Sequence, residues 1–177
     1  MNIYIIENWK SNIDRKVPKE YWATNLIENT FNDIQITKDE RGKPYVIGED
    51  KFINWSHTER FLVVAISTAG NIGIDAENLI IPYEESLYGW ILHEQEKSKL
   101  KTGTLFSEIW TRKEAILKFT GEGINENMCE LNSYAPDYNI SSLTYNNLSI
   151  SVCFEEHSEI LTINKLEKRP GNIRRII

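Results

Sequence analysis

Four charged side chains in two short segments have the types and spacing for chemistry on a phosphate ester: Asp75, Glu77, Glu114 and Lys118. Successive side chains of a strand alternate between faces, so a strand at residues 73–77 would point both of its carboxylates the same way. Residues four apart in a helix share a face, so a helix at residues 110–118 would present Glu114 and Lys118 together. If the segments meet, a hard divalent cation would hold the three carboxylates, and the ammonium would suit a phosphate beside it.

Each pattern also has an ordinary structural explanation when it stands alone. Asp75 and Glu77 then form a polar strand end that enters a loop. Glu114 and Lys118 then form an ion pair on a helix surface, which contributes only about 0.3 kcal/mol. The functional interpretation therefore depends on what accompanies the two patterns along the chain.

Two further segments precede the first carboxylate pair. Residues 42–44 read Gly-Lys-Pro, which predicts a turn, and residues 54–57 read Asn-Trp-Ser-His. The Ser56 hydroxyl and the His57 imidazole can both hydrogen-bond phosphate oxygens, although a lone histidine in a loop is more often a plain turn residue. The chain has no P-loop motif and no nucleophile elbow.

The elements that must position these residues fall into two halves of similar pattern. Apolar periodicity and turn signals predict a helix at 18–31 and strands at 3–6, 45–47, 61–67 and 72–77, the last two as a hairpin. The second half is predicted to contain helices at 84–101 and 105–119 and strands at 148–154 and 160–166. We therefore predict an α+β fold: one globular unit with an N-terminal lobe at 1–80 and a C-terminal lobe at 81–177.

Composition limits the classes of function. The 177 residues carry a net charge of -6, which argues against non-specific nucleic-acid binding. The two cysteines lack C-x-x-C spacing, so we expect neither a zinc site nor a disulfide framework, and a cytoplasmic location fits best. No signal peptide and no membrane-spanning apolar run is expected. The basic segment at 165–175 is expected to be a solvated, frayed terminus, with a patch for an anionic partner as the alternative.

Taken in order, the segments resemble one family. Gly-Lys-Pro at 42–44, Asn-x-Ser-His at 54–57, Gly-Ile-Asp-x-Glu at 73–77 and Trp-x-x-Lys-Glu-Ala-x-x-Lys-x-x-Gly-x-Gly at 110–123 resemble the 4'-phosphopantetheinyl transferase superfamily. The chain looks most like its single-chain, pseudo-dimeric members. The resemblance implies two similar α/β lobes, each with a helix on a small antiparallel sheet, related by a pseudo-two-fold axis with the active site in the cleft between them.

The resemblance also implies a reaction and a role for each matching residue. Such enzymes move the phosphopantetheine group of coenzyme A to a serine hydroxyl of an apo acyl or peptidyl carrier protein, with Mg²⁺ as cofactor, and release adenosine 3',5'-bisphosphate. A monomer is the simpler expectation for an internally duplicated chain. The implied metal ligands are Asp75, Glu77 and Glu114; the implied catalytic residues are Glu114, as base, and Lys118; the implied coenzyme A contacts are Lys43, Ser56, His57, Lys113 and Lys118.

One departure from the family pattern leaves alternatives open. Longer relatives carry a basic segment ahead of Gly-Lys-Pro that holds the coenzyme A 3'-phosphate, whereas residues 21–26 here contain no basic residue. A degenerate member that binds coenzyme A or a carrier domain without turnover is therefore one alternative. A Mg²⁺-dependent phosphohydrolase of unrelated fold is another, since Asp-x-Glu with a distant glutamate would suffice for it.

Overall fold

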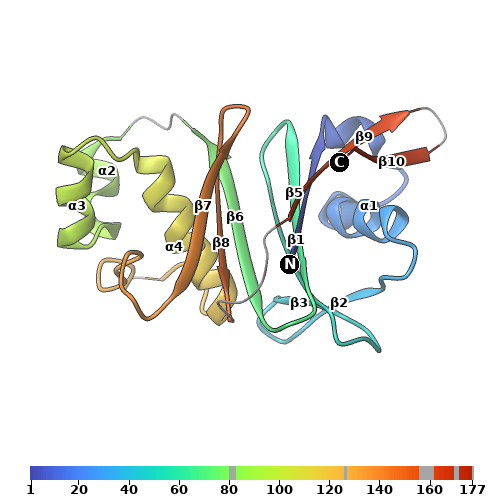
Figure 1. The fold of residues 1–177 in the computed structure, drawn as a ribbon, viewed down its shortest axis with the longest axis horizontal. Helices are drawn as coiled ribbons and strands as arrows, with labels where there is room; N and C mark the ends of the chain where they lie inside the picture. Colours follow the sequence, from blue (N-terminus) through green and yellow to red (C-terminus); the bar gives the residue numbers. More distant parts are fainter. Residues whose placement is uncertain (80–82, 126, 156–161, 170–171, 177) are drawn as a thin grey trace.

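The computed structural model describes residues 1–79, 83–125, 127–155, 162–169 and 172–176, and it has the predicted α+β architecture. Two β-sheets pack face to face, and each has a helix on its outer face, so the layers run α/β/β/α (Figure 1). Helix α1 (Trp22–Thr30) covers one sheet and helix α4 (Phe106–Thr120) covers the other. The predicted pseudo-two-fold relation between the halves stays a prediction.

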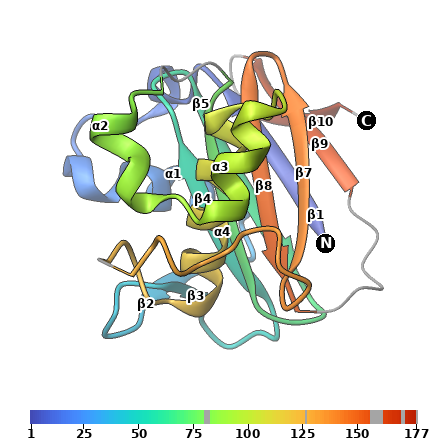
Figure 2. The ribbon, with the colours of Figure 1, turned by 90° about the vertical axis from the view of Figure 1, so that its left-hand side faces the viewer.

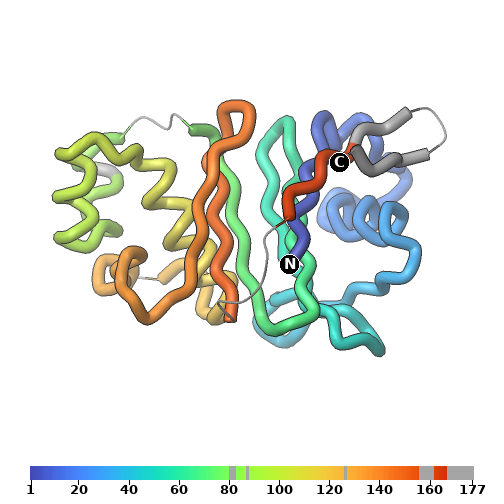
Figure 3. Tube along the Cα trace, viewed as in Figure 1, coloured from blue at the N-terminus to red at the C-terminus, as the bar shows by residue number. Residues whose placement is uncertain are grey.

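The larger sheet has five strands in the order β10-β9-β1-β5-β4. Their bounds are Asn2–Glu7 for β1, Phe52–His57 for β4, Phe61–Ser67 for β5, Thr162–Arg169 for β9 and Asn172–Ile176 for β10. Strands β1 and β9 pair in parallel and the other neighbours are antiparallel, so this sheet is mixed rather than purely antiparallel. Figure 3 shows β9 running beside the N-terminal strand.

The smaller sheet has three antiparallel strands in the order β6-β8-β7: Ile72–Asn78, Leu148–Phe154 and Asn139–Tyr145. Alternate residues of β6 and β8 face the larger sheet and form the central core with β5. The other residues of β6 face α4, because side chains alternate along a strand. Asp75 and Glu77 therefore lie on the helix side of this sheet, pointing the same way as predicted.

The predicted hairpin of strands 61–67 and 72–77 is wrong, although both strands are confirmed. Strand β5 is paired on one edge with β1 and on the other with β4, which leaves no edge for β6. The chain instead crosses from one sheet to the other after β5, and β6 pairs with β8. The nearly continuous burial of β5 is the physical sign of a central strand covered on both faces.

The predicted helix at 84–101 is divided. Helix α2 (Glu85–Tyr88) is followed by a 3-10 turn at Gly89–Ile91, and α3 (Glu94–Lys101) begins anew after His93. His93 accepts a hydrogen bond from the Gln95 N–H and the Glu96 side chain accepts from the His93 N–H, which is a capping box that starts a helix. Figure 2 looks from the side on which α2 and α3 lie outside α4.

A small separate hairpin, β2 (Ile36–Lys38) with β3 (Pro44–Val46), contains the Gly-Lys-Pro segment. The Asp39 carboxylate accepts hydrogen bonds from the N–H groups of Arg41 and Lys43, at 2.9 and 2.8 Å. Gly42 has φ +83°, which a glycine adopts without strain. The turn is therefore held by its own side chain and backbone, and it projects from the larger sheet toward the end of α4.

The C-terminal basic segment differs from the expected frayed terminus. Its described residues belong to strands β9 and β10, which pair antiparallel, and β9 pairs in parallel with β1 from the opposite end of the sequence. The lobe boundary after residue 80 stays a prediction. The sheets exchange strands across that boundary, because β6 from the first half joins the smaller sheet while β9 and β10 from the second half join the larger one.

Candidate active site

The close contact between β6 and α4 depends on Gly73. A Cβ atom on Gly73 would lie 2.2 Å from the Ala115 carbonyl oxygen and 2.3 Å from the Phe119 nitrogen, both backbone atoms of α4. Only a glycine fits this approach of helix to strand. Because Asp75 and Glu77 follow on the same face, the approach places both carboxylates beside the face of α4 that carries Glu114 and Lys118.

Asp75 is the centre of the polar contacts at this site. Its Oδ1 atom accepts hydrogen bonds from the Ser56 hydroxyl at 2.8 Å and from the Lys118 ammonium at 2.7 Å. The Asp75 residue is 4% exposed, and its Oδ2 atom is buried without a hydrogen-bond partner among the residues that the structure describes. A buried carboxylate oxygen without a donor is costly in a folded protein, so this oxygen is available to a ligand atom or ion.

Glu114 has the most strongly shifted carboxyl group of the site. Burial, and then the negative charges of Asp75 and Glu77, raise its pKa to about 7 against the opposing effect of the Lys118 ammonium. Its Oε1 atom is buried, and no described residue forms a hydrogen bond with it. Burial and the Asp75 charge also raise the pKa of Glu77. A carboxyl group whose pKa lies near neutrality can accept and release a proton at physiological pH.

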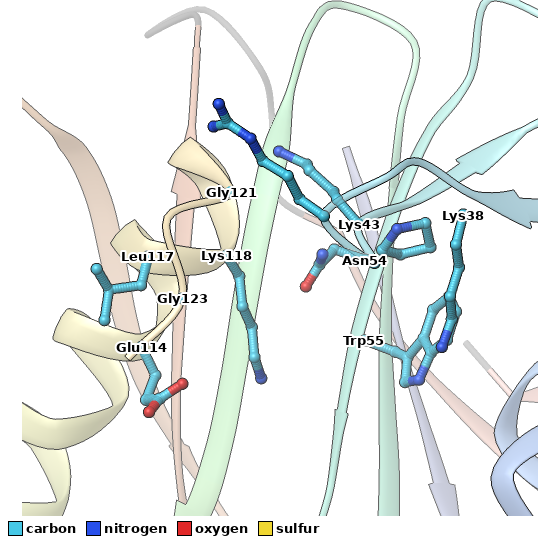
Figure 4. Close-up of a pocket in the computed structure, with 12 residues that line it drawn as sticks. Lys38, Lys43, Asn54, Trp55, Glu114, Leu117, Lys118, Gly121 and Gly123 are labelled. Atoms are coloured by element: carbon cyan, nitrogen blue, oxygen red, sulfur yellow. The ribbon is translucent and has the colours of Figure 1, made fainter. Parts of the chain in front are cut away.

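Two adjoining cavities surround these side chains. The first, of about 290 Å³, is lined by Trp55, Ser56, His57, Asp75, Glu77, Trp110, Glu114 and Lys118. The second, of about 270 Å³, shares Trp55, Glu114 and Lys118 with the first and extends to the β2–β3 hairpin and Gly121. Figure 4 shows Glu114 and Lys118 projecting from α4 on one side of it and Lys43, Asn54 and Trp55 on the other.

Six of the predicted site residues thus come together in the first cavity: Ser56, His57, Asp75, Glu77, Glu114 and Lys118. Ser56 and His57 lie on strand β4 rather than in the predicted loop. The imidazole of His57 stacks on the indole of Trp9, with ring centroids 5.1 Å apart and planes at 27°. Trp9 itself is fixed by a hydrogen bond from its indole N–H to the Thr58 carbonyl at 3.0 Å, so the stack holds His57 in one orientation.

Lys43 lies in the wall of the second cavity. Its ammonium donates a hydrogen bond of 2.5 Å to the Phe119 carbonyl, which also accepts from the Asn71 amide at 2.7 Å. Burial lowers the pKa of Lys43. Because carbonyls of a helix's last turn have no partner within the helix, Lys43 ties the β2–β3 hairpin to the end of α4.

Lys113 lies away from the other predicted site residues. Its side chain has no exposed surface, and its ammonium forms an ion pair of 2.9 Å with the equally buried Glu96. It also donates hydrogen bonds to the carbonyls of Met128 and Leu131. In this arrangement Lys113 fastens α4 to α3 and to the segment that follows residue 127, and it has no surface with which to contact coenzyme A.

The donors at the site fit a Mg²⁺ ion held in part by its substrate. The described part of the chain contains no group of three or more His, Cys, Asp or Glu side chains arranged to hold a metal ion. Mg²⁺ is commonly bound through one or two carboxylates together with substrate phosphates and waters. The unpartnered oxygens of Asp75 and Glu114 meet that requirement, whereas the other Asp75 oxygen is engaged by Ser56 and Lys118.

Sequence reasoning missed four residues that line the second cavity: Lys38, Arg41, Asn54 and Trp55. Asn54 and Trp55 belong to the Asn-x-Ser-His segment, and the Asn54 side chain accepts the Ile74 N–H at 3.2 Å. Their place in that segment was the signal in the sequence that could have identified both residues. Lys38 and Arg41 are ordinary surface cations in the sequence, and only the folding of the β2–β3 hairpin against the site reveals them.

A family model described as the 4'-phosphopantetheinyl transferase superfamily matches residues 71–167, which is more than half of the chain. The chain therefore belongs to this superfamily. It is 31% identical over 122 residues to a Synechocystis protein with a provisional 4'-phosphopantetheinyl transferase name, a match that covers 63% of this chain and 48% of that protein.

Two further relatives bear the same enzyme name without qualification. A 4'-phosphopantetheinyl transferase of Aneurinibacillus migulanus is 32% identical over 100 residues, covering 52% of this chain and 40% of that protein. The 4'-phosphopantetheinyl transferase AcpT of Escherichia coli K12 is 25% identical over 151 residues, covering 76% and 75%. The chain spans less than half the length of the first two relatives. Their activity is therefore a proposal for this chain and not a conclusion.

Proposed function

We propose that this chain transfers the 4'-phosphopantetheine group of coenzyme A to a serine hydroxyl of an apo acyl or peptidyl carrier protein and releases adenosine 3',5'-bisphosphate. The observation that carries the proposal is Glu114, a half-buried residue beside the Lys118–Asp75 ion pair, with a pKa of about 7 and a buried Oε1 atom that has no hydrogen-bond partner among the described residues. Membership of the superfamily supports the same reaction.

The residues can divide the chemistry as follows. The hydroxyl oxygen of the carrier serine attacks the phosphorus that bears the pantetheine arm, and Glu114 accepts the hydroxyl proton. A new P–O bond forms, the pyrophosphate P–O bond breaks, and the negative charge passes to the leaving adenosine 3',5'-bisphosphate. Lys118 lines both cavities, where its ammonium can bind the transferred phosphate, and Asp75 holds it there.

Mg²⁺ is part of the proposal. Asp75 and Glu114 would hold it through their unpartnered oxygens, and Glu77 lies in the same cavity wall as a further carboxylate. Bound there, the ion would neutralise charge on the substrate pyrophosphate. Metal binding by Glu114 competes with its role as base, since a carboxylate cannot give the same lone pair to both.

The test is a mass measurement on an apo carrier protein incubated with the chain, coenzyme A and Mg²⁺. We expect a gain of one phosphopantetheine group and a rate that falls when the pH is low enough to protonate Glu114, because the carboxyl group must be ionised to accept a proton. Glu114→Gln should lower the rate by about 10²–10⁴-fold. The matched control is Glu130→Gln, at an exposed glutamate outside both cavities.

The same assay distinguishes the alternatives. Calorimetric binding of coenzyme A with no mass gain on any peptidyl, acyl or aryl carrier would indicate a binding protein without turnover. Release of inorganic phosphate from simple esters would indicate a phosphohydrolase. None of the described helices combines the length and apolar character that a membrane span requires. As a separate proposal, the chain is a monomer of the cytoplasm, as expected for an internally duplicated chain without a cysteine framework.

A further inference from the structure

A cluster of hydroxyl groups joins α4 to the smaller sheet, and the proposed chemistry does not use it. The hydroxyl oxygen of Thr111, on α4, lies 2.8 Å from that of Ser151 and 3.2 Å from that of Ser149, both on β8. The Ser151 oxygen also lies 3.0 Å from that of Ser142 on β7. Thr111, Ser149 and Ser151 are all buried. Three buried hydroxyls therefore meet where apolar side chains could have filled the space between helix and sheet.

The hydrogen bonds fix the direction of the protons in this cluster. A hydroxyl group has one proton to donate and two lone pairs that accept. Thr111 donates its proton to the Glu108 carbonyl of its own helix, at 3.1 Å. Ser149 and Ser151 are then the donors in their contacts with Thr111, whose oxygen accepts from both. Removal of this one oxygen would deprive two buried serine hydroxyls of the acceptor that they share.

The two serines lie directly beside the carboxylates of the candidate active site. In the pairing of β6 with β8, Ser151 is opposite Asp75 and Ser149 is opposite Glu77. Residues directly opposite each other on neighbouring antiparallel strands share one face of the sheet, so both serines face α4 as the carboxylates do. Thr111 thus contacts the sheet at the two positions next to Asp75 and Glu77.

On the helix, the contact lies one turn before Glu114. Residues three and four apart are neighbours on a helix surface, so Thr111, Glu114 and Lys118 form one stripe along α4. The close approach at Gly73 holds the helix against β6 on the C-terminal side of Glu114. Thr111 holds it against β8 on the N-terminal side. Glu114 therefore lies between two fixed points of the same helix.

Hydroxyl contacts define the position of a helix more narrowly than apolar contacts do. A hydrogen bond weakens steeply as its geometry departs from the optimum, whereas the hydrophobic effect is non-directional. A buried hydroxyl that loses its partner is left unsatisfied, which opposes any sliding of α4 along β8. Displacement of a reacting group by about 1 Å can lower a rate by about 10²-fold. The Thr111 contacts are therefore placed to control the separation of Glu114 from the carboxylates on β6.

We propose that Thr111 is a positioning residue for Glu114. By accepting hydrogen bonds from Ser149 and Ser151, it holds α4 at the separation from β6 that lets the unpartnered oxygens of Asp75 and Glu114 bind the same ion. This inference rests on the proposed function for the reaction and for Mg²⁺. Thr111 is fully buried and lines neither cavity, so it acts only through the placement of Glu114.

The experiment compares Thr111→Val with Thr111→Ser in the full chain. Valine keeps the shape of threonine and removes the hydroxyl, whereas serine keeps the hydroxyl. In the mass assay on the carrier protein, Thr111→Val should lower kcat by about 10- to 100-fold, because Glu114 is displaced from its partners. The KM for coenzyme A should stay nearly unchanged, since no residue that lines a cavity is altered. Thr111→Ser should retain most of kcat.

Binding of Mn²⁺, used in place of Mg²⁺, gives a second readout that requires no transfer. Electron paramagnetic resonance measures the Mn²⁺ dissociation constant of the full chain in the presence of coenzyme A. This constant should rise by about 10-fold or more in Thr111→Val and stay close to that of the unmodified chain in Thr111→Ser. If no carrier gained mass while Mn²⁺ binding followed this pattern, the positioning role would stand and the proposed transfer would fail.

Two control variants separate positioning from a general loss of packing. Thr30→Val removes a hydroxyl on α1 that donates to the Leu26 carbonyl. Ile116→Val shortens a buried side chain of α4 that lines neither cavity. Both should leave kcat and Mn²⁺ affinity close to those of the unmodified chain. Circular dichroism confirms that each variant is folded, and if Thr111→Val does not fold, Ser151→Ala, which removes one of the two donors, should lower both quantities in part.

Several outcomes would overturn the positioning role. One is a Thr111→Val chain with unchanged kcat and Mn²⁺ affinity. Others are a loss in Thr111→Ser as large as that in Thr111→Val, an equal loss in either control variant, or a raised KM for coenzyme A with kcat unchanged. An unmodified chain that neither transfers the group nor binds Mn²⁺ would overturn the positioning role together with the proposed function.

Discussion

Helix α4 contributes a lysine to each of two ion pairs with opposite environments. Lys113 and Glu96 are fully buried, and the three donors of the ammonium reach Glu96 and two carbonyls. Glu96 also accepts hydrogen bonds from the N–H groups of His93 and Ser133, so each of its two oxygens has a donor. Every polar group of this pair has a partner, so the pair is complete without a ligand.

The Lys118–Asp75 pair is incomplete in comparison. The Lys118 side chain is 28% exposed, and within the described part of the chain both Asp75 and the neighbouring Glu114 have a buried oxygen without a hydrogen-bond partner. The two pairs differ little in residue type or distance, at 2.9 and 2.7 Å. What separates them is satisfaction of hydrogen bonds, because unsatisfied polar groups next to a cavity mark a place where a ligand replaces the missing partners.

The largest effect is expected at the complete pair. Lys113→Ala should lower the free energy of unfolding by about 3–5 kcal/mol, because it leaves the Glu96 carboxylate buried without its counter-charge. Urea denaturation measures this loss. The control Lys97→Ala, at an exposed ion pair on α3, should cost less than about 1 kcal/mol. Equal losses in the two variants would show that Lys113 does not anchor α4.

A smaller effect is expected from Glu114, whose raised pKa couples stability to pH. Between its ordinary value of 4.5 and about 7, the folded chain keeps the Glu114 proton while the unfolded chain loses it. Stability from this group is therefore fully present below pH 4.5 and is lost as the pH rises to about 7. We expect the free energy of unfolding to fall by about 2 kcal/mol over this pH window. This is less than the full pKa shift would give, because water in the cavity reaches the carboxylate.

The variant Glu114→Gln isolates this contribution, because its neutral amide does not titrate. The unfolding free energies of the chain and of the variant are measured from pH 4 to 8. The value for the chain minus the value for the variant should fall as the pH rises. Glu77→Gln serves as a comparison, since burial and Asp75 raise the pKa of Glu77 as well. A difference that is independent of pH would contradict the raised pKa of Glu114.

Local periodicity predicted that Asp75 shares a face with Glu77 and that Glu114 shares a face with Lys118, whereas the meeting of the two segments was implied by the resemblance to the family. Side chains two apart on a strand and four apart on a helix share a face wherever the elements lie. The position of Lys113 was not predictable in full. Residues adjacent in a helix point about 100° apart, so the sequence already indicates that Lys113 and Glu114 point in different directions. The partner of Lys113, Glu96, lies on another helix, and only tertiary packing brings them together.

The sheet pairing shows the same limit at the level of the fold. The pattern of residues 61–67 predicts a buried strand, but it does not specify that both of its edges are occupied by β1 and β4. Strand β7 and the hairpin of β2 with β3 have weak apolar alternation, and their positions follow from contacts with β8 and α4. The sequence alone therefore does not predict that the cations of that hairpin line the second cavity, because tertiary packing places them there.

The smallest effect on stability, and the sharpest test of the comparison, is expected at Lys118. Lys118→Ala should lower the free energy of unfolding by about 1 kcal/mol or less, since water in the cavity can replace the ammonium beside Asp75. Its effect on transfer, measured by mass on the carrier protein, should nevertheless exceed tenfold, because among the described residues that line both cavities Lys118 is the one cation. Lys118→Arg keeps the charge and should recover part of the rate. If Lys118→Ala destabilised the fold as strongly as Lys113→Ala while leaving transfer unchanged, the two ion pairs would both be structural, and the distinction by unsatisfied oxygens would fail.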